Sequence, residues 1–272
     1  MKNKSVETRV DHCFATLRKE GKKGFIAYIT AGDPDLETTL ENVLLLERAG
    51  VEGVELGIPF SDPLADGRVN QESAQRALTA GTTINGVFDM VKRLRETSAI
   101  PIVCYCYMNL LFAPGFERTI KRAARAGVDG MLILDLPTEE SGAYAASLAA
   151  AGLNAIVLIT PTSPDARIRS IVRSASGFVY AVSRTGVTGV QREVATSAGD
   201  LLKRARKVTD LPLALGFGIS NPAQAGEAAR FADAVVVGSA IVQRLHDAKH
   251  SKTTRKGVEA WVRSMVQAVK ES

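Results

Sequence analysis

One pattern recurs along the chain: a short apolar run followed by a segment with helical periodicity. The runs are nearly continuous in hydrophobic residues, which is typical of parallel strands covered on both faces. Eight of them occur, at residues 25–30, 51–58, 101–107, 130–135, 155–160, 177–183, 213–218 and 234–239. Eight strand–helix units within about 250 residues predict an α/β protein with one closed (β/α)8 TIM barrel spanning residues 1–272. The alternative, a doubly wound open sheet, would carry a GxGxxG motif after its first strand, and this sequence has none.

The predicted helices have recognisable starts. Asp33–Pro34 and Asn221–Pro222 each combine a capping residue with a first-turn proline, so both predict helix N-termini. An additional helix is expected over residues 5–20, before the first strand, because Val10, Phe14 and Leu17 would share one face. A further short helix is expected directly after the eighth strand.

Composition excludes several classes of protein. The 272 residues carry a net charge of +5, from 34 basic and 29 acidic residues, and much of the excess lies near the two ends. Such ends are typical of solvated termini, so no nucleic-acid binding is expected. No apolar run is long enough for a membrane span, and the first residues are too polar for a signal peptide, so the cytoplasm is the expected location. Three cysteines and three histidines lack metal-ligand spacing, so we predict no metal site.

Residues 55–67, ELGIPFSDPLADG, contain two unusual carboxylates. Glu55 lies inside an apolar strand, where a charged group is costly unless it is paired or functional. Asp66 lies eleven residues further on, in a loop stiffened by Pro59 and Pro63. Two carboxylates in different environments suit general acid–base catalysis. The alternative is a satisfied core glutamate followed by an acidic surface loop. In a barrel the loops after the strands form the active site, which favours catalysis.

Glycine-rich segments follow the sixth, seventh and eighth strands and predict a phosphate site. Glycine lets backbone N–H groups approach an anion, and the helix expected to begin at Ser239 would add its N-terminal dipole. Tight turns without a ligand are the alternative. The candidate phosphate-binding residues are Gly189, Gly218, Gly238 and Ser239.

Aromatic side chains predict a flat apolar pocket beside that anion site. Side-chain alternation places Tyr105 and Tyr107 on one face of the third strand and Cys104 and Cys106 on the other. We expect the tyrosines to point into the barrel with Glu55 and the cysteines to pack under helices. Asp135 and Asn109 also lie at strand ends. The sequence leaves two roles possible for each side chain: contact with a ligand, or a hydrogen bond within the loop. Further candidate pocket residues are Tyr28, Tyr180 and Phe217.

Together these motifs resemble the tryptophan synthase alpha chain family. The similar segments are TAGDPD, ELGIPFSDPLADG, YMN, LDLPTEES, TPTSPDARI, SRTGVTG, LGFGIS and VVVGSAIV, in family order and over nearly the whole chain. The resemblance implies a (β/α)8 barrel with no cofactor of its own. It also implies cleavage of indole-3-glycerol phosphate to indole and glyceraldehyde 3-phosphate. Indole would then pass to a pyridoxal-phosphate-bearing beta chain in an α2β2 heterotetramer.

The resemblance also implies roles for individual residues. Glu55 would be the general acid–base and Asp66 the partner of the indole N–H, with the ring of Tyr180 beside the glutamate. Thr188 would lie in a loop that closes over the segment carrying Asp66. The residues that would line the indole pocket are Tyr28, Tyr105, Leu158 and Phe217, and the four phosphate-site residues given above also fall at family positions.

Four positions depart from the family pattern, one of them Leu110, where a proline often follows the asparagine. Arg68 and Asn70 replace a usual proline and a usual apolar pocket residue, and Tyr105 is bulkier than the usual aliphatic. Asn70 could weaken the packing of indole or form a hydrogen bond that the sequence does not identify. Two alternatives therefore stay open: a weakly catalytic barrel that mainly regulates a beta chain, or another phosphate-binding barrel such as an isomerase or epimerase. The lack of a strand-borne histidine argues against the metal-dependent epimerases.

Overall fold

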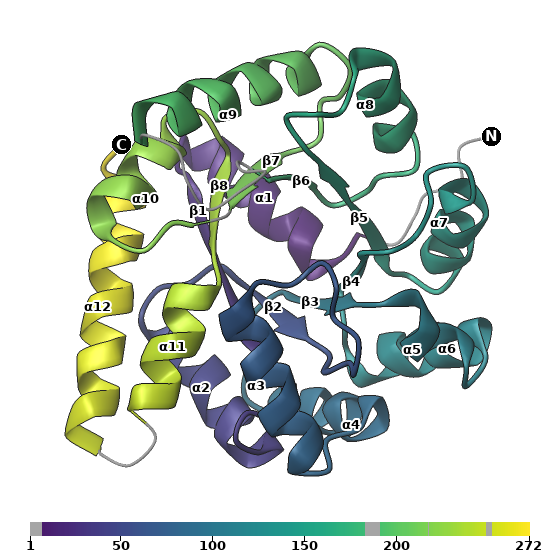
Figure 1. The fold of residues 1–272 in the computed structure, drawn as a ribbon, viewed down its shortest axis with the longest axis vertical. Coiled ribbons are helices and arrows are strands. Elements are labelled where there is room, and N and C mark those ends of the chain that lie inside the picture. Colours follow the sequence, from purple (N-terminus) through teal and green to yellow (C-terminus); the bar gives the residue numbers. More distant parts are fainter. Residues whose placement is uncertain (1–6, 183–190, 217, 249–251) are drawn as a thin grey trace.

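The computed structural model describes residues 7–182, 191–216, 218–248 and 252–272, which form a closed barrel of parallel strands (Figure 1). Each strand pairs with the next along the chain, and β8 pairs with β1. The (β/α)8 prediction is confirmed, with each strand close to its expected run. The strands are β1 (Gly24–Thr30), β2 (Gly53–Gly57), β3 (Ile102–Cys106), β4 (Gly130–Ile133), β5 (Asn154–Ile159), β6 (Val179–Val182), β7 (Leu213–Gly216) and β8 (Ala234–Val237).

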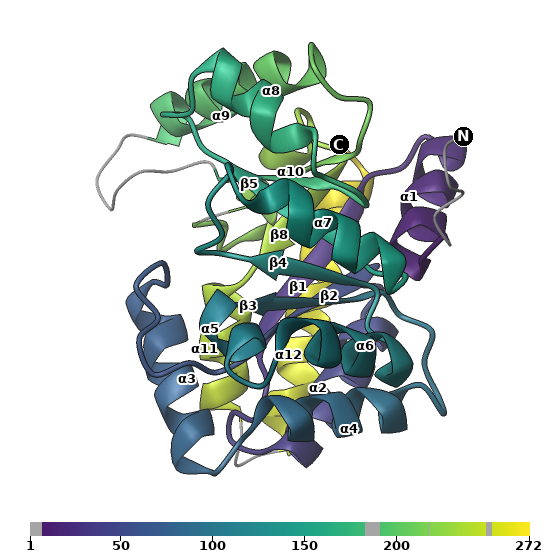
Figure 2. The same cartoon turned by 90° about the vertical axis from the view of Figure 1, so that its right-hand side faces the viewer.

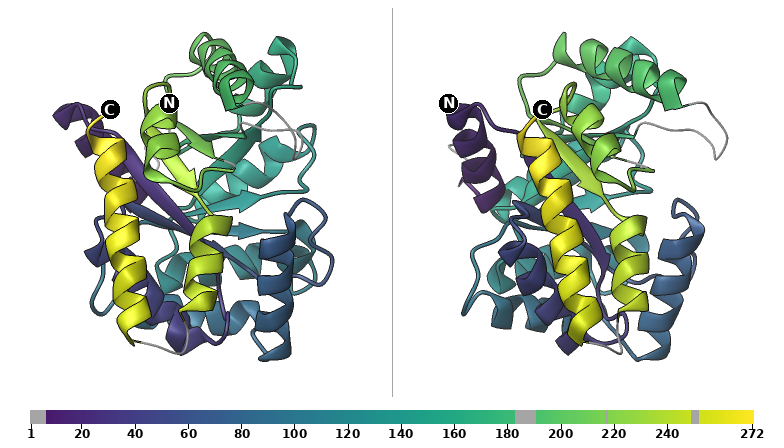
Figure 3. Two further views of the ribbon diagram at one scale, coloured as in Figure 1. Left: turned by 60° about the vertical axis from the view of Figure 1, so that its left-hand side comes forward. Right: turned by 90° about the vertical axis from the view of Figure 1, so that its left-hand side faces the viewer.

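Helices surround the barrel (Figures 1 and 2). They are α1 (Arg9–Glu20), α2 (Leu36–Arg48), α3 (Arg68–Thr79), α4 (Ile84–Leu94), α5 (Met108–Phe112), α6 (Phe116–Ala126), α7 (Ser141–Ala150), α8 (Asp165–Val172), α9 (Gln191–Arg206), α10 (Pro222–Ala229), α11 (Ser239–Asp247) and α12 (Lys252–Lys270). The extra N-terminal helix and the short helix after β8 are confirmed as α1 and α11. The last helix, α12, runs beside α10 and α11 (Figure 3). Within the described residues, no helix combines the length and the apolarity needed to cross a membrane.

Strand side chains alternate between the barrel interior and the helix layer. Val54 and Leu56 pack in the outer core with the helices, whereas Glu55 between them lines an interior cavity. Cys104 and Cys106 also belong to the outer core, while Tyr105 packs with the interior cluster. The predicted facing is confirmed for Glu55, Tyr105 and the two cysteines, because a period of two forces neighbours to opposite faces, whereas Tyr107 lies beyond the end of β3 and does not line the cavity.

The two ends of the barrel differ in what covers them. Helix α1 lies across one end, where Phe14 contacts Phe178 with ring centroids 5.5 Å apart. The segment between β2 and α3, which holds Asp66, lies at the opposite end (Figure 2). That opposite end receives the carboxyl ends of all eight strands, where barrel chemistry takes place.

The start of α2 differs from the prediction. Asp35 is its N-cap and accepts a 2.6 Å hydrogen bond from Thr38 N, so Asp33 does not cap the helix. Asp33 instead precedes a cis peptide bond to Pro34 and accepts a 2.6 Å hydrogen bond from Arg76 Nη2. The prediction was wrong because Asp35, two residues after Asp33, is an equally good capping residue. The cap of α10 is confirmed, since Asn221 caps it and Pro222 is its first residue.

Candidate active site

Glu55 is a buried carboxyl in the middle of β2. It pairs in register with Tyr28 on β1 and Val103 on β3, and only 1% of its surface is exposed. Burial disfavours the charged form and raises the pKa of Glu55 to about 8. Its Oε1 atom has no hydrogen-bond partner among the residues that the structure describes. A carboxyl group that is largely protonated near neutral pH and faces a cavity can give up a proton and then take one back.

Asp66 is held by two tyrosine hydroxyls from β3 and the residue after it. Tyr105 donates to Oδ1 and Tyr107 donates to Oδ2, each at 2.9 Å. Tyr107 also accepts a 3.0 Å hydrogen bond from Ala65 N, which fixes the loop itself. Burial raises the pKa of Asp66, while hydrogen bonds from both tyrosines and from Asn70 oppose that rise. The carboxylate is therefore fixed in place before any ligand arrives.

A cavity of about 210 Å³ lies beside Glu55 at the carboxyl end of the barrel, and Asp66 is not among its lining residues, although its neighbours Gly67 and Tyr105 are. It brings Glu55 together with three of the predicted tyrosines and three of the predicted phosphate-site residues. The described residues that line it are Tyr28, Glu55, Gly67, Arg68, Val69, Asn70, Tyr105, Tyr180, Gly218, Ile219, Val236, Gly238 and Ser239. One wall is aromatic and the other is made of glycine-rich turns, which suits a flat ring with an anionic tail.

Two glycines make room for the aromatic wall. A Cβ at Gly57 would lie 2.3 Å from the hydroxyl of Tyr28, and a Cβ at Gly216 would lie 2.2 Å from the hydroxyl of Tyr180. Both tyrosines are buried, and burial raises the pKa of each hydroxyl above its ordinary value, so both stay neutral at physiological pH. Tyr28 meets Tyr105 edge to face, with centroids 5.0 Å apart.

The anion end of the cavity is the start of α11. Gly238 is the N-cap, and no side chain caps the helix there. Ser239 is the first residue of α11, so its end of the helix presents backbone N–H groups and a positive dipole to the cavity. Gly218 has φ 75°, a conformation that favours glycine.

Other predicted residues lie elsewhere. Leu158 pairs with Tyr180 in register but lines a separate cavity of about 120 Å³ with Leu134 and Ile156. Tyr107 is not among the cavity-lining residues and acts on Asp66 instead. Thr188, Gly189 and Phe217 lie outside the described residues.

Both open strand-end residues can now be placed. Asp135 accepts a 2.7 Å hydrogen bond from Met108 N, which favours the loop role. Asn109 is exposed in α5, a short helix that the sequence analysis did not predict.

Arg68 and Asn70 line the cavity, although the sequence indicated them only as departures from a family pattern. Arg68 pairs with Glu72 at 2.7 Å on the exposed face of α3. The Oδ1 atom of Asn70 is buried and finds no hydrogen-bond partner within the described part of the chain. Both residues directly follow the acidic loop, in the first turn of α3. This position in the sequence could have indicated that they line the pocket. Across the part of the chain that the structure describes, no His, Cys, Asp and Glu cluster is placed to hold a metal.

The fold and the cavity are typical of barrel enzymes that perform acid–base chemistry on a flat substrate with a phosphate group. Residues 14–270 match the family model described as tryptophan synthase alpha chain. The chain belongs to the tryptophan synthase alpha chain family.

Individual relatives agree over nearly the full length. The chain is 50% identical to the tryptophan synthase alpha chain of Citrifermentans bemidjiense, over 87% of this chain and 88% of that one. It is 47% identical to that of Geotalea daltonii, over 96% and 97%. Its structure is similar to that of tryptophan synthase subunit alpha from Legionella pneumophila, with a TM-score of 0.90 and 33% identity, covering 98% of this chain and all of that one.

Proposed function

We propose that Glu55 and Asp66 carry out the alpha reaction of this family, in which indole-3-glycerol phosphate is cleaved to indole and glyceraldehyde 3-phosphate. The chain is a carbon–carbon lyase of that family. The observation that supports the residue assignment is that Glu55, whose Oε1 atom has no hydrogen-bond partner among the described residues, lines a cavity that also contains the start of α11.

The reaction needs one proton to be given and one to be taken. Protonated Glu55 donates to indole C3, which places a positive charge on the ring near N1. The hydroxyl on the glycerol carbon that is bonded to C3 then loses its proton to Glu55, and its oxygen becomes the carbonyl oxygen of the aldehyde. The C–C bond breaks, and its electron pair restores the C2–C3 double bond of indole. The carboxylate of Asp66 stabilises the N1–H charge while it exists, and no other reactant is consumed.

The phosphate would occupy the end of the cavity at Gly218, Gly238 and Ser239. Gly189 and Thr188 stay predicted parts of this site and of a closing loop, and Phe217 and Leu158 stay predicted parts of the indole pocket. Purified protein mixed with indole-3-glycerol phosphate, with glyceraldehyde 3-phosphate measured enzymatically, tests the function directly. Release of both products in equal amounts supports it, and no release with or without a beta chain contradicts it.

Tyr105→Phe is expected to lower kcat/KM for cleavage by about 10- to 100-fold. The change removes one of the donors that hold Asp66, and a hydrogen bond to a charged group is worth about 1.5–3 kcal/mol. Because that donor lowers the pKa of Asp66, its loss raises this pKa and shifts the acidic limb of the kcat/KM profile to higher pH. The pH profile separates a positioning role from simple loss of packing.

Tyr144→Phe is the matched control for this variant. Tyr144 lies in α7, where its ring meets Phe116 edge to face at 4.8 Å, away from the cavity. It should leave both the rate and the pH profile unchanged. An unshifted acidic limb in Tyr105→Phe would show that this hydroxyl does not act through Asp66.

A beta chain is the partner that the family implies, and we propose an α2β2 heterotetramer with pyridoxal phosphate on the beta chain. Supporting it, two large apolar side chains are exposed at the end of the barrel that holds the cavity: Leu64 is 93% exposed and Phe112 is 63% exposed. Exposed apolar groups around a site mouth are typical of docking surfaces. The cytoplasm stays our prediction for where this complex works.

Phe112→Ser is expected to weaken binding of the beta chain by about 10-fold or more, since buried aromatic anchors carry much of an interface's energy. Cleavage by the isolated chain should not change, because Phe112 does not line the cavity. Phe231→Ser is the control, as Phe231 is also exposed but precedes β8 at the opposite end of the barrel. Titration calorimetry gives both affinities, and equal effects of the two changes would place the docking surface elsewhere.

A further inference from the structure

A second cavity, of about 120 Å³, lies in the wall of the barrel between β4 and β5. The pairing of these two strands ends at Leu132 and Ile156, although β5 continues to Ile159. Helices α7 and α8 lie on either side of β5 and both contact it (Figure 1). They do not cover the strand completely, because Val157 and Leu158 in its second half are partly exposed. The second cavity therefore passes through a gap in the wall and opens toward solvent.

The lining of the second cavity is apolar and uncharged. Most of it consists of leucine, isoleucine, valine, alanine and methionine side chains, and its described lining residues include no charged group. A phosphate would lose its hydration there without compensation, whereas a neutral ring would gain by leaving water. An apolar cavity of about 150 Å³ is large enough to bind benzene, so the volume here suits a small aromatic ligand whose edge stays at the opening.

The polar side chains among the described lining residues are three hydroxyls, those of Thr138, Ser141 and Ser174. Ser141 Oγ is 2.8 Å from the carbonyl oxygen of Thr138, and Ser174 Oγ is 3.0 Å from that of Ile171. The two serine oxygens are also 3.0 Å apart. Whichever of these acceptors takes each hydrogen, lone pairs on the serine oxygens remain free, so the pair can accept a further hydrogen bond. The ligand that fits is an apolar ring with a donor on its edge.

Contacts across the gap hold the second cavity open. Ser141 is the first residue of α7 and Ser174 follows α8, so their hydrogen bond joins the two flanking helices. Arg167 on α8 also pairs with Glu139, just before α7, at 2.9 Å. The space between the helices is therefore formed before any ligand binds, which lowers the cost of binding.

The second cavity is also a close neighbour of the catalytic one. Leu158 lines the second cavity and pairs in register with Tyr180, which lines the catalytic cavity. Both side chains pack in the same interior cluster with Tyr105. A neutral ring released in the catalytic cavity is thus formed within one layer of side chains of the second.

We propose that the cavity between β4 and β5 is a second binding site, which takes indole, the neutral product of cleavage, and rejects the phosphate-bearing substrate. Indole has an apolar ring surface, a single N–H donor and no acceptor, which matches the lining. Its N–H would be accepted by the Ser141–Ser174 pair, and its ring would pack on Leu158. The inference goes beyond the proposed catalytic roles, although it rests on indole as the product of this chain.

Binding of indole while the catalytic cavity is blocked tests this inference. The blocking ligand is indole propyl phosphate, a substrate analogue without the two glycerol hydroxyls, which therefore cannot be cleaved. Equilibrium dialysis of radiolabelled indole against the blocked wild type should give one further indole per chain. Benzofuran has an acceptor oxygen in place of the N–H, so it should compete for this site about 5-fold more weakly than indole.

Ala145→Phe should weaken binding of this further indole by about 10-fold or more, because Ala145 on α7 lines the second cavity and the added ring would fill it. Cleavage should be unchanged, since Ala145 does not line the catalytic cavity. Ala146→Phe is the matched control, because Ala146 is exposed on the same helix and does not line the second cavity. It should bind indole as wild type does. Ala145→Leu replaces Ala145→Phe if the latter does not fold.

Three results would overturn the inference: no indole bound by the blocked wild type, equal binding by Ala145→Phe, or benzofuran binding as tightly as indole. Cleavage is assayed on the same samples, so the two proposals can fail separately. A wild type that cleaves the substrate but binds no further indole contradicts only the inference. A wild type that cleaves nothing contradicts the proposed function, and the dialysis result still decides the inference.

Discussion

Glu55→Gln is expected to reduce kcat for cleavage of indole-3-glycerol phosphate by at least about 1,000-fold. General acid–base groups typically contribute about 10²–10⁴-fold, and here one carboxyl both donates and accepts a proton. Glutamine keeps the shape and the neutral charge of protonated Glu55, so binding of a non-cleavable substrate analogue should be unchanged. A rapid-quench assay of the first turnover measures the effect on the chemical step.

The pH dependence of the same variant provides an independent check. Because burial raises the pKa of Glu55 from 4.5 to about 8, the folded protein binds more protons than the unfolded chain between these values. Stability of the wild type should therefore fall as pH rises through that window, relative to Glu55→Gln, by a few kcal/mol in total. Activity of the wild type should fall above about pH 8, as Glu55 loses its proton.

Two results would contradict this account of Glu55. One is a variant that retains more than about a tenth of wild-type kcat, which general acid–base catalysis does not allow. The other is an unfolding midpoint that has the same pH dependence in both proteins, which would mean that Glu55 titrates normally. Urea unfolding at several pH values between 5 and 9 measures the second quantity.

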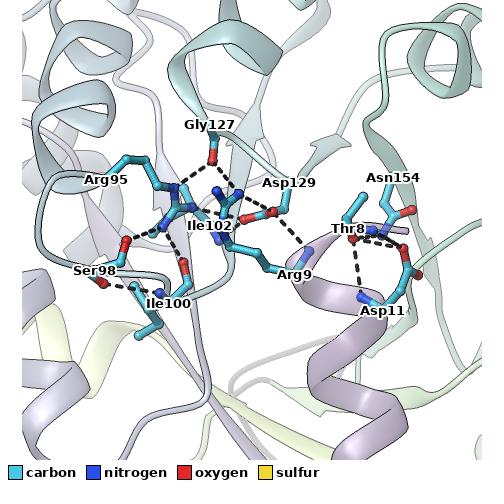
Figure 4. A network of polar contacts seen from close by, with 10 residues as sticks. All are labelled: Thr8, Arg9, Asp11, Arg95, Ser98, Ile100, Ile102, Gly127, Asp129 and Asn154. Carbon is cyan, nitrogen blue, oxygen red and sulfur yellow. Dashed lines mark hydrogen bonds and ion pairs between the residues drawn. The ribbon is translucent and has the colours of Figure 1, made fainter. Parts of the chain in front are cut away.

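Asp129→Ala is expected to destabilise the protein by about 3–5 kcal/mol, the cost of leaving a buried charge without its partner. Asp129 lies just before β4, at the end of the barrel remote from the cavity, and only 2% of its side chain is exposed. It accepts hydrogen bonds from Arg95 Nη2 at 3.0 Å, from Arg9 Nη1 at 3.0 Å and from Ile102 N at 2.9 Å (Figure 4).

Arg95 explains why the loss should be large. Its guanidinium also donates to the carbonyls of Gly127 and Ile100, at 2.9 and 2.7 Å, and only 12% of the side chain is exposed (Figure 4). Burial lowers the pKa of Arg95 to about 10, and the negative charge of Asp129 opposes that shift. Without Asp129 the buried cation keeps its carbonyl acceptors but loses the carboxylate that is hydrogen-bonded to it, and the buried N–H of Ile102 loses its acceptor.

The matched control is Asp89→Ala. Asp89 pairs with Arg122 at the same 3.0 Å, but its side chain is 70% exposed, so the loss should be below about 1 kcal/mol. Urea unfolding compares the two variants, with Arg9→Ala as a milder change if Asp129→Ala does not fold. Equal destabilisation by Asp129→Ala and Asp89→Ala would contradict the prediction, because it would mean that burial does not increase the contribution of an ion pair to the free energy of unfolding.

Periodicity was sufficient to predict the barrel. Alternation along β2 and β3 also placed Glu55 and Tyr105 inside and Cys104 outside, because a strand has only two faces. Helix ends were less predictable, since Asp33 and Asp35 are both good caps and only the tertiary contact of Asp33 with Arg76 separates them. The short helix α5 has no cap or periodic signal of sufficient length.

The sequence identified several of the residues that line the cavity, whose roles stay predictions, but it did not predict the hydrogen bonds between them. Asp66 and Glu55 were identified from their unusual places in the sequence. The hydrogen bonds from Tyr105 and Tyr107 to Asp66 depend on how the loop after β2 folds back over β3, and no spacing rule encodes this. The sequence indicated Asn70 as an unusual residue, but it could not show that its Oδ1 atom has no hydrogen-bond partner among the described residues.

Cleavage in deuterium oxide tests the central claim most directly, because the proton that reaches indole C3 must come from Glu55. Wild-type protein is incubated with indole-3-glycerol phosphate in D2O, and the products are examined by proton NMR. The account predicts 3-deuterioindole and glyceraldehyde 3-phosphate in equal amounts from the wild type, and neither product above background from Glu55→Gln. Deuterated indole formed by Glu55→Gln at the wild-type rate would contradict it.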